Sequence, residues 1–272
     1  MSENILELRN LRKVFAARSA GMSAGIVAVD DVSFDVVRGS SLGIVGESGS
    51  GKTTTARIIA GLETAAAGTL DIGGESVDMS RRFNRGPSTL QMVFQDPFGS
   101  FDPRQRIGAA IDELLRIGTR LDRTARRARV ADLLEQVGLN ASHAEELPRN
   151  LSGGQRQRAA IARALALRPR ILILDEAVSA LDVSVQAQVL NLLADIRRDT
   201  EITYLFVSHD LAVIRQISDR CIVMQAGRIV EQGTTAEVLT DPQEEYTKRL
   251  LDAVPRPGWK PGRGLAHNGS GT

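Results

Sequence analysis

The chain has 272 residues, of which 42% are hydrophobic, so it is long enough for one large domain with a full core, and disorder throughout is excluded. Its 34 basic residues nearly balance its 33 acidic ones. This balance argues against a dedicated nucleic-acid binder, because such proteins usually carry a clear basic excess. The single Cys221 excludes a disulfide framework and a cysteine-rich metal site.

The N-terminus, Met1 to Ile5, lacks the basic and then apolar layout of a signal peptide. Nowhere do about 18 apolar residues follow one another without a charge, which is the length needed to span a bilayer as a helix. We therefore expect a chain that crosses no membrane by itself and that works in a reducing, cytoplasmic compartment. If it acts at a membrane, a partner must recruit it.

The first part of the chain is expected to consist mainly of strands, where apolar residues alternate with polar ones or follow each other directly. The predicted elements, in chain order, are a strand at 5–15, a loop of small residues at 16–28, strands at 29–37 and 42–45, a helix at 53–62 and a strand at 68–72.

From about residue 103 to 147 the apolar residues follow helical spacing, and Gly138 is a typical helix stop. Beyond this stretch the predicted elements are strands at 171–174, 203–207 and 221–225 and helices at 155–167, 184–198 and 211–217. Apolar strands that alternate with helices predict a parallel sheet covered on both faces. The helical stretch is therefore expected to be an insertion into an α/β core, and residues 255–272 are expected to form a flexible tail.

Residues 46–53 match the phosphate-loop pattern G-x-x-x-x-G-K-[ST], between a predicted strand and a predicted helix. Glycines let backbone N–H groups approach phosphate oxygens, with the positive end of the helix behind them. Lys52 is expected to reach the β- and γ-phosphates of ATP, and Thr53 is expected to hold Mg²⁺ through its hydroxyl. The expected nucleotide contacts here are Gly46, Glu47, Ser48, Gly49, Ser50, Gly51, Lys52, Thr53 and Thr54.

The apolar strand at 171–174 ends in two carboxylates, Asp175 and Glu176. In open α/β sheets the carboxyl ends of the strands open beside the ligand. Asp175 is therefore expected in the Mg²⁺ shell, and Glu176 is expected to polarise the attacking water. The alternative for this pair is an ordinary acidic turn after a core strand.

A second candidate anion site begins at Ser152, where Ser152-Gly153-Gly154-Gln155 opens a predicted helix. Ser152 is a plausible N-cap, and the two glycines expose backbone N–H groups at the positive helix end. One ATP does not need two such sites in one chain, unless each chain offers the second to the nucleotide of a partner. The pair of sites therefore indicates dimerisation, although Ser-Gly-Gly is also an ordinary helix cap.

Six motifs in one order make the chain resemble the nucleotide-binding subunit of ABC transporters over about residues 5–240. They are the phosphate loop at 46–53, Gln95 after an apolar strand, Ser152–Gln155, Asp175-Glu176, Ser179–Asp182, and His209 after another strand. The resemblance implies a P-loop NTPase core with a parallel sheet, an N-terminal antiparallel β subdomain and an inserted helical subdomain. It implies an ATPase domain at 1–254 whose helical subdomain lies at about 96–167.

The resemblance also supplies roles. Gln95 resembles the glutamine that senses Mg²⁺ and water and contacts the membrane subunits, and His209 resembles the switch histidine that contacts the γ-phosphate. With Lys52 and Glu176, His209 completes the expected catalytic set. Phe15 resembles the aromatic residue that stacks on adenine, with packing in the core as the alternative. The other implied nucleotide contacts are Ser152, Gly153, Gly154, Gln155 and Asp182, the last as a link between two sites of a dimer.

Two such subunits, identical or related, are implied to enclose two Mg·ATP between them. The implied further partners are two transmembrane permease subunits at the cytoplasmic face of the inner membrane and, indirectly, a substrate-binding protein; no nucleic acid is expected. The stretches 94–104 and 241–251 are similar to peptide-importer ATPases. Residues 144–150 lack the glutamate–glycine pattern of exporters. Import of dipeptides or oligopeptides is therefore favoured, with nickel or glutathione-like cargo as the alternative.

Two functions of other classes fit the sequence less well than transport. An ABC-type ATPase that acts on nucleic acid or ribosomes would carry long coiled coils or two cassettes in one chain, and this chain has neither. A module that only senses ATP would not need Lys52, Asp175, Glu176 and His209 together. The sequence therefore favours an ATP-hydrolysing transport subunit.

Overall fold

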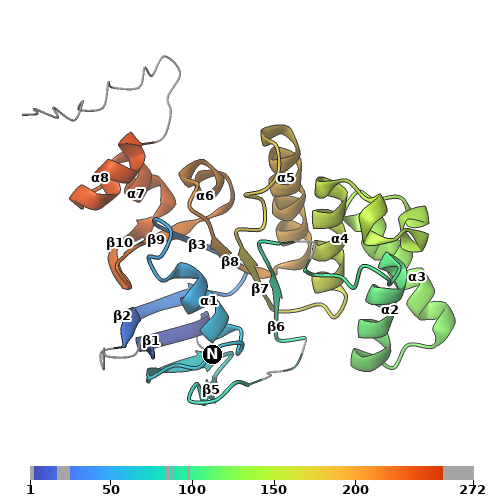
Figure 1. Ribbon diagram of the computed structural model, residues 1–272, viewed down its shortest axis with the longest axis horizontal. Coiled ribbons are helices and arrows are strands. Elements are labelled where there is room, and N and C mark those ends of the chain that lie inside the picture. The colour runs from blue at the N-terminus through green and yellow to red at the C-terminus, as the bar shows by residue number, and fades with distance from the viewer. Residues whose placement is uncertain (1–2, 17–24, 84–85, 87, 97–98, 254–272) are drawn as a thin grey trace, which may run out of the picture.

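The computed structural model describes residues 3–16, 25–83, 86, 88–96 and 99–253, which form two β-sheets surrounded by helices (Figure 1). The strands are β1 Asn4–Phe15, β2 Ile26–Val37, β3 Ser41–Val45, β4 Ala67–Ile72, β5 Glu75–Val77, β6 Leu90–Val93, β7 Ile171–Asp175, β8 Thr203–Val207, β9 Arg220–Gln225 and β10 Arg228–Thr234. The α-helices are α1 Lys52–Ile59, α2 Ile107–Gly118, α3 Arg123–Gln136, α4 Gly153–Leu165, α5 Val183–Thr200, α6 Leu211–Ile217, α7 Thr235–Thr240 and α8 Glu245–Asp252. Within the described ranges, none of these helices has the length and hydrophobicity to cross a bilayer.

The larger sheet has the strand order β10-β9-β3-β8-β7-β6. Its neighbouring strands run parallel, except that β10 pairs with β9 antiparallel. Because the parallel strands all end at one edge, the segments that follow β3, β6, β7 and β8 come together there. Those segments contain the phosphate loop, Gln95, Glu176 and His209, so the sheet alone assembles most of the predicted site.

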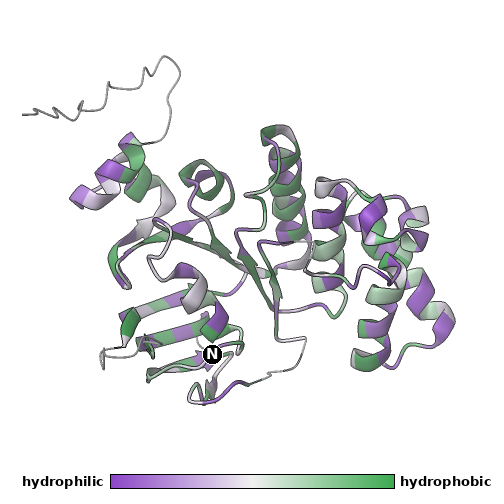
Figure 2. Ribbon diagram, in the orientation of Figure 1, coloured by the Kyte–Doolittle hydropathy of each residue, from purple (hydrophilic) through white to green (hydrophobic). Residues whose placement is uncertain are grey.

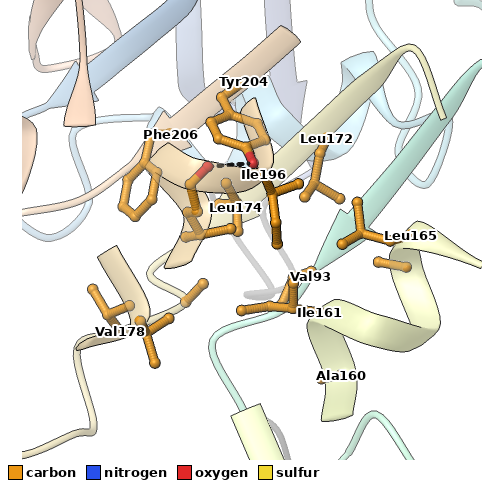
Figure 3. Packing of buried hydrophobic residues seen from close by; sticks show 14 of the residues in the cluster. Val93, Ala160, Ile161, Leu165, Leu172, Leu174, Val178, Ile196, Tyr204 and Phe206 are labelled. Atoms are coloured by element: carbon orange, nitrogen blue, oxygen red, sulfur yellow. Dashed lines mark hydrogen bonds between the residues drawn. The ribbon is translucent and has the colours of Figure 1, made fainter. Parts of the chain in front are cut away.

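Both faces of this sheet are covered, and neighbouring residues of each strand face opposite sides. Ile171 and Ile173 join a hydrophobic cluster with α1 and the smaller sheet, whereas Leu172 and Leu174 join a cluster with α4, α5 and α6. Figure 3 shows part of the second cluster, with Val93 between the strands and α4. In Figure 2 the central strands are hydrophobic along their length. Burial on both sides explains why the sequence shows apolar runs here instead of alternation.

The smaller sheet has the order β2-β1-β4-β5, and all its pairs are antiparallel. Together with α1, it packs against the face of the larger sheet that carries Ile171 and Ile173 (Figure 1). Between β6 and β7 the chain forms α2, α3 and α4, and α2 and α3 stand beyond the edge of the larger sheet. The predicted fold class, an α/β core with a parallel sheet, an N-terminal antiparallel β subdomain and a helical subdomain, is confirmed. The bounds 1–254 and 96–167 stay predictions, and the tail at 255–272 lies outside the described residues.

Some element predictions were wrong. Residues 26–28 belong to β2 and not to a loop, because Ile26 and Val27 extend the ladder with Phe15 and Val14. Helix α1 ends at Ile59, and Gly61 follows it with a φ of +73°. The strands β5 and β10 and the helices α7 and α8 were not predicted. They have three to eight residues each, and α7 and α8 are shorter than the roughly 11-residue window in which helical periodicity is recognised.

Candidate active site

The phosphate loop joins β3 to α1 and is closed against the hairpin between β9 and β10. Gly46 has a φ of +147°, and a Cβ there would lie 2.2 Å from the carbonyl oxygen of Met224. Gly51 has a φ of +102°, and a Cβ there would lie 2.6 Å from the carbonyl oxygen of Ala28. Only glycine fits at these two positions. The N–H of Gly227 also donates to the carbonyl of Ser50 at 3.0 Å, which fixes the loop to the hairpin.

Lys52 is the first residue of α1, and only 4% of its surface is exposed. Its ammonium donates to the carbonyl oxygens of Gly46 and Glu47, both at 2.8 Å. Burial lowers the pKa of Lys52, and the nearby carboxylates of Glu176 and Asp175 act in the opposite direction. The loop thus holds a cation at its centre, close to the N-terminus of a helix, where an anion is favoured.

Asp175 is the last residue of β7, and 3% of it is exposed. The hydroxyl of Thr53 donates to its Oδ1 at 3.0 Å. Burial raises the pKa of Asp175, and the hydrogen bond from Thr53 partly offsets this. The pair places a hydroxyl and a carboxylate, both hard oxygen donors, directly beside the phosphate loop.

Glu176 lies between two side chains from neighbouring strand ends. Its Oε2 accepts a hydrogen bond from Nε2 of Gln95 at 2.8 Å, and its Oε1 lies 3.3 Å from Nδ1 of His209. The backbone of Glu176 has a φ of +48°, which is uncommon for a residue with a Cβ, and its N–H donates to the carbonyl of Val207 at 2.9 Å. Backbone strain of this kind clusters at functional sites.

A cleft of about 350 Å³ opens over the loop and joins most of the predicted residues. It is lined by Ala28, Ser48, Gly49, Gly51, Lys52, Thr53, Thr54, Gln95 and Glu176. Asp175 and His209 contact this lining through Thr53 and Glu176. The cleft therefore combines the buried ammonium of Lys52, the hard oxygen donor of Thr53 and the hydrogen-bonded carboxylate of Glu176.

Phe15 is not part of this lining. Its side chain is 38% exposed, and the ammonium of Lys13 lies 4.8 Å from the centre of its ring. The alternative that Phe15 packs in the core is therefore wrong. Its stacking on adenine stays a prediction.

Ser152 to Gln155 form the start of α4 and, like Phe15, do not line the cleft of their own chain. The hydroxyl of Ser152 accepts from the N–H of Gln155 at 3.2 Å, and the side-chain oxygen of Gln155 accepts from the N–H of Ser152 at 2.9 Å. This reciprocal capping box was not predicted, although serine followed three residues later by glutamine is its known signal. In Figure 1, α4 lies apart from α1, toward α2 and α3.

Asp182 is the N-cap of α5 and accepts from the N–H of Val185 at 2.9 Å and from the hydroxyl of Ser184 at 2.6 Å. The bond from Ser184 and then that from Val185 lower the pKa of Asp182. This local role explains why an aspartate suits the position. The expected role of Asp182 as a link between the two nucleotide sites of a dimer stays a prediction.

Replacing Asp175 by asparagine should stabilise the ligand-free protein. Asparagine keeps an acceptor for Thr53 but removes a buried charge, and we expect the melting temperature to rise by roughly 2–4 °C, the effect of about 1 kcal/mol in a chain of this size. Because the pKa of Asp175 is raised in the folded state, the wild-type protein loses folding stability as the pH rises above about 4 and this carboxyl ionises. The difference in melting temperature between the variant and the wild type, which we call the stability gap, should therefore grow above that pH.

Thermal melting between pH 4 and 8 measures this gap. The exposed cap residue Asp122, replaced by asparagine, serves as the control and should not raise the melting temperature, because no buried charge is removed there. A gap that is absent, or that grows on acidification, would contradict the burial cost assigned to Asp175.

A comparison with family models matches residues 29–179 to the ABC transporter family. Among curated proteins, the chain is 48% identical over 258 residues to the glutathione import ATP-binding protein GsiA of Escherichia coli (strain K12), and 47% identical to the protein of that name from Salmonella choleraesuis (strain SC-B67). Each alignment covers 93% of this chain and 41% of the relative. The chain thus spans about two fifths of the length of these relatives.

Solved structures of similar fold include cbiO1 from Clostridium perfringens, part of the ABC transporter complex cbiONQ. It has a TM-score of 0.75 at 26% identity, over 88% of this chain and 92% of that chain. The dimeric structure of MJ0796, a bacterial ABC transporter cassette, has a TM-score of 0.75 at 27% identity, over 85% of this chain and 98% of that chain. The same cassette has also been solved as a dimer in a post-hydrolysis state with ADP and Pi, at a TM-score of 0.74.

Proposed function

This chain belongs to the ABC transporter family, in which it is an ATP-binding subunit that couples ATP hydrolysis to transport, and we propose that the transport it powers is the import of peptides. The observation that carries the proposal is the 48% identity, over 93% of the chain, to a glutathione import ATP-binding protein. Glutathione-like peptides are therefore the cargo class to test first. The resemblance of 94–104 and 241–251 to peptide importers supports the same class.

The residues of the cleft fit a nucleoside triphosphate. The ammonium of Lys52 is buried and donates to carbonyl and hydroxyl oxygens of its own loop. Phosphate oxygens can replace the bonds to Glu47 and Ser50 with stronger, charge-assisted ones while the bond to Gly46 is kept. Gly49 has nothing within 4 Å of the position of a Cβ, which leaves room for a ligand against the backbone. We assign the phosphates of ATP to this loop, with Ser48 to Thr54 around them.

Thr53 and Asp175 fit Mg²⁺, because a hydroxyl and a carboxylate are the hard donors that this ion prefers. Mg²⁺ supplies positive charge that neutralises the phosphate oxygens during transfer. Gln95 borders the same cleft and is the third residue that we assign to the ion.

Hydrolysis requires a group that orients water and accepts its proton, and the surroundings of Glu176 support this role for its carboxylate. Gln95 and His209 hold its two oxygens from either side, so the carboxylate is preorganised at the rim of the cleft. A proton on Nδ1 of His209 would stabilise the negative charge of Glu176. We assign Glu176 as the base, with Lys52 and His209 as the other catalytic residues.

The start of α4 supplies N–H groups for an anion but does not line its own cleft. We infer that two chains meet head to tail, so that Ser152, Gly153 and Gly154 of one chain face the phosphates bound by the other. Loss of the γ-phosphate would remove the anion that both chains share and release the contact. The cassette MJ0796, which is similar to this chain, has been solved as a dimer, and this supports the dimerisation that we infer.

The remaining partners follow from membership of a transporter. We propose two permease subunits in the inner membrane, with this chain at their cytoplasmic face, and a substrate-binding protein that delivers the cargo. The helices α2 and α3, which stand beyond the edge of the larger sheet, and Gln95 are the segments that we assign to the contact with the permeases.

Uptake by cells of the source organism tests the cargo. Cells whose own copy carries Glu176→Gln would be compared with wild-type cells for uptake of labelled glutathione, a labelled tripeptide and Ni²⁺. Loss of uptake of glutathione or the tripeptide, with Ni²⁺ uptake unchanged, is the expected result. Loss of Ni²⁺ uptake alone would overturn the peptide assignment, and unchanged uptake of all three would overturn import of these cargoes.

A further inference from the structure

A side chain from the far end of the chain contacts the phosphate loop. The hydroxyl oxygen of Tyr246, in α8, accepts a hydrogen bond from the backbone N–H of Glu47 at 3.1 Å, across 199 residues of sequence. Tyr246 is 7% exposed and packs in a hydrophobic cluster with Val238 and Leu239 of α7. The guanidinium of Arg249 lies 6.0 Å from the centre of its ring. Packing therefore holds the hydroxyl in place against the loop.

The N–H of Glu47, which donates to Tyr246, and the C=O of Gly46, which accepts from Lys52, belong to the same peptide group. A trans peptide is planar, and its C=O and N–H point in opposite directions. The carbonyl of Gly46 accepts from the ammonium of Lys52 at 2.8 Å, and the N–H of Glu47 donates to Tyr246. The Gly46–Glu47 peptide is thus held from both sides. Gly46 has no side chain to restrict its rotation, so these contacts set its orientation.

We propose that Tyr246 is a positioning residue for ATP binding. Its hydroxyl fixes the Gly46–Glu47 peptide and, through the carbonyl of Gly46, the ammonium of Lys52 that receives the phosphates. Preorganised groups lose less entropy when a ligand binds, so the contact strengthens binding of the phosphate part of the nucleotide. The proposal rests on ATP binding at this loop and is independent of the direction of transport and of the cargo.

Tyr246→Phe is the variant that tests the proposal, because it removes the hydroxyl and keeps the packed ring. Tyr204 provides a matched control, since the chain has only two tyrosines. Tyr204 is fully buried in the main core, and its hydroxyl donates to the carbonyl of Leu193 at 2.9 Å (Figure 3). Tyr204→Phe therefore also removes one tyrosine hydroxyl bond, but at a place that does not line the cleft.

The measurements are KM and kcat for MgATP, the dissociation constants of ADP and adenosine, and thermal melting, for wild type and both variants. In Tyr246→Phe we expect KM for MgATP and the dissociation constant of ADP to rise about 2- to 10-fold, as the loss of one hydrogen bond predicts. Its kcat and its affinity for adenosine, which has no phosphate, should stay close to wild type. Tyr204→Phe should lower the melting temperature without changing KM.

Three results would overturn the proposal: wild-type KM and ADP affinity in Tyr246→Phe, the same change in Tyr204→Phe, or an equal loss of affinity for adenosine. Failure of the wild-type chain to bind ATP would overturn the assigned site and this proposal together. Equal binding of ATP by the wild type and Tyr246→Phe would overturn the proposal alone.

Discussion

Glu176→Gln should lower ATP turnover by about 100-fold or more while nucleotide binding is kept, since a positioned general base typically contributes at least that factor. Glutamine has the shape of glutamate and can still bond to Gln95 and His209, but it cannot accept a proton from water. The phosphate loop, to which we assign the affinity for ATP, is unchanged. Phosphate release at saturating MgATP and equilibrium binding of ATP measure the two effects.

The matched control is Glu145→Gln, a glutamate whose ion pair with Arg106 lies on the surface of the helical region. It should turn over ATP like the wild type, because surface ion pairs contribute little. Glu176→Gln should also remain a dimer in the presence of ATP. Wild-type turnover in Glu176→Gln would contradict the assignment of Glu176 as the base.

Lys52→Met should weaken binding of ATP by about 10- to 100-fold, as expected for the loss of a charge-assisted hydrogen bond in a buried site. The ammonium of Lys52 is the cation at the centre of the loop, and methionine keeps most of its volume without the charge. Because burial already penalises the charged form of Lys52, we expect the melting temperature to change little. Titration with a fluorescent ATP analogue, together with thermal melting, measures both quantities.

Lys248→Met, at an exposed position of α8, controls for the loss of one positive charge. It should bind the analogue like the wild type. Should Lys52→Met also bind ATP with wild-type affinity, the phosphates could not lie against this loop.

The sequence predicts the centre of the site because the chemistry there is local or lies at strand ends. The phosphate loop is one continuous motif. Gln95, Glu176 and His209 each follow a buried strand, and parallel strands bring their carboxyl ends to one edge. A correct prediction of the strands therefore places these side chains together without any knowledge of their distances.

Other features depend on contacts that no local pattern encodes. The bond between Tyr246 and Glu47 joins segments 199 residues apart, and α8 was not predicted as a helix. The closure of Gly51 against Ala28 needs β2 to begin at Ile26, a stretch whose small and mixed residues suggested a loop. Glu176 combines a positive φ with a bond from its N–H to Val207 on the neighbouring strand, which lies 31 positions further along the sequence. Tertiary packing decides each of these.

Completion of each ATP site by a second chain can be tested by mixing two variants that are each inactive. Lys52→Met disables the phosphate loop. Gly153→Asp places a carboxylate at the start of α4, where the nearest atom to a new Cβ is 3.8 Å away and a helix tolerates an acid. A dimer with one chain of each kind contains one intact site, built from the loop of one chain and the α4 start of the other.

We expect each variant alone to be inactive and an equal mixture to regain about a quarter of the wild-type ATPase rate. Random pairing in a symmetric dimer makes half of the dimers mixed, and each mixed dimer has one intact site of two. A mixture as inactive as the separate variants, under conditions in which the wild-type chain alone hydrolyses ATP, would contradict completion of the site by a second chain.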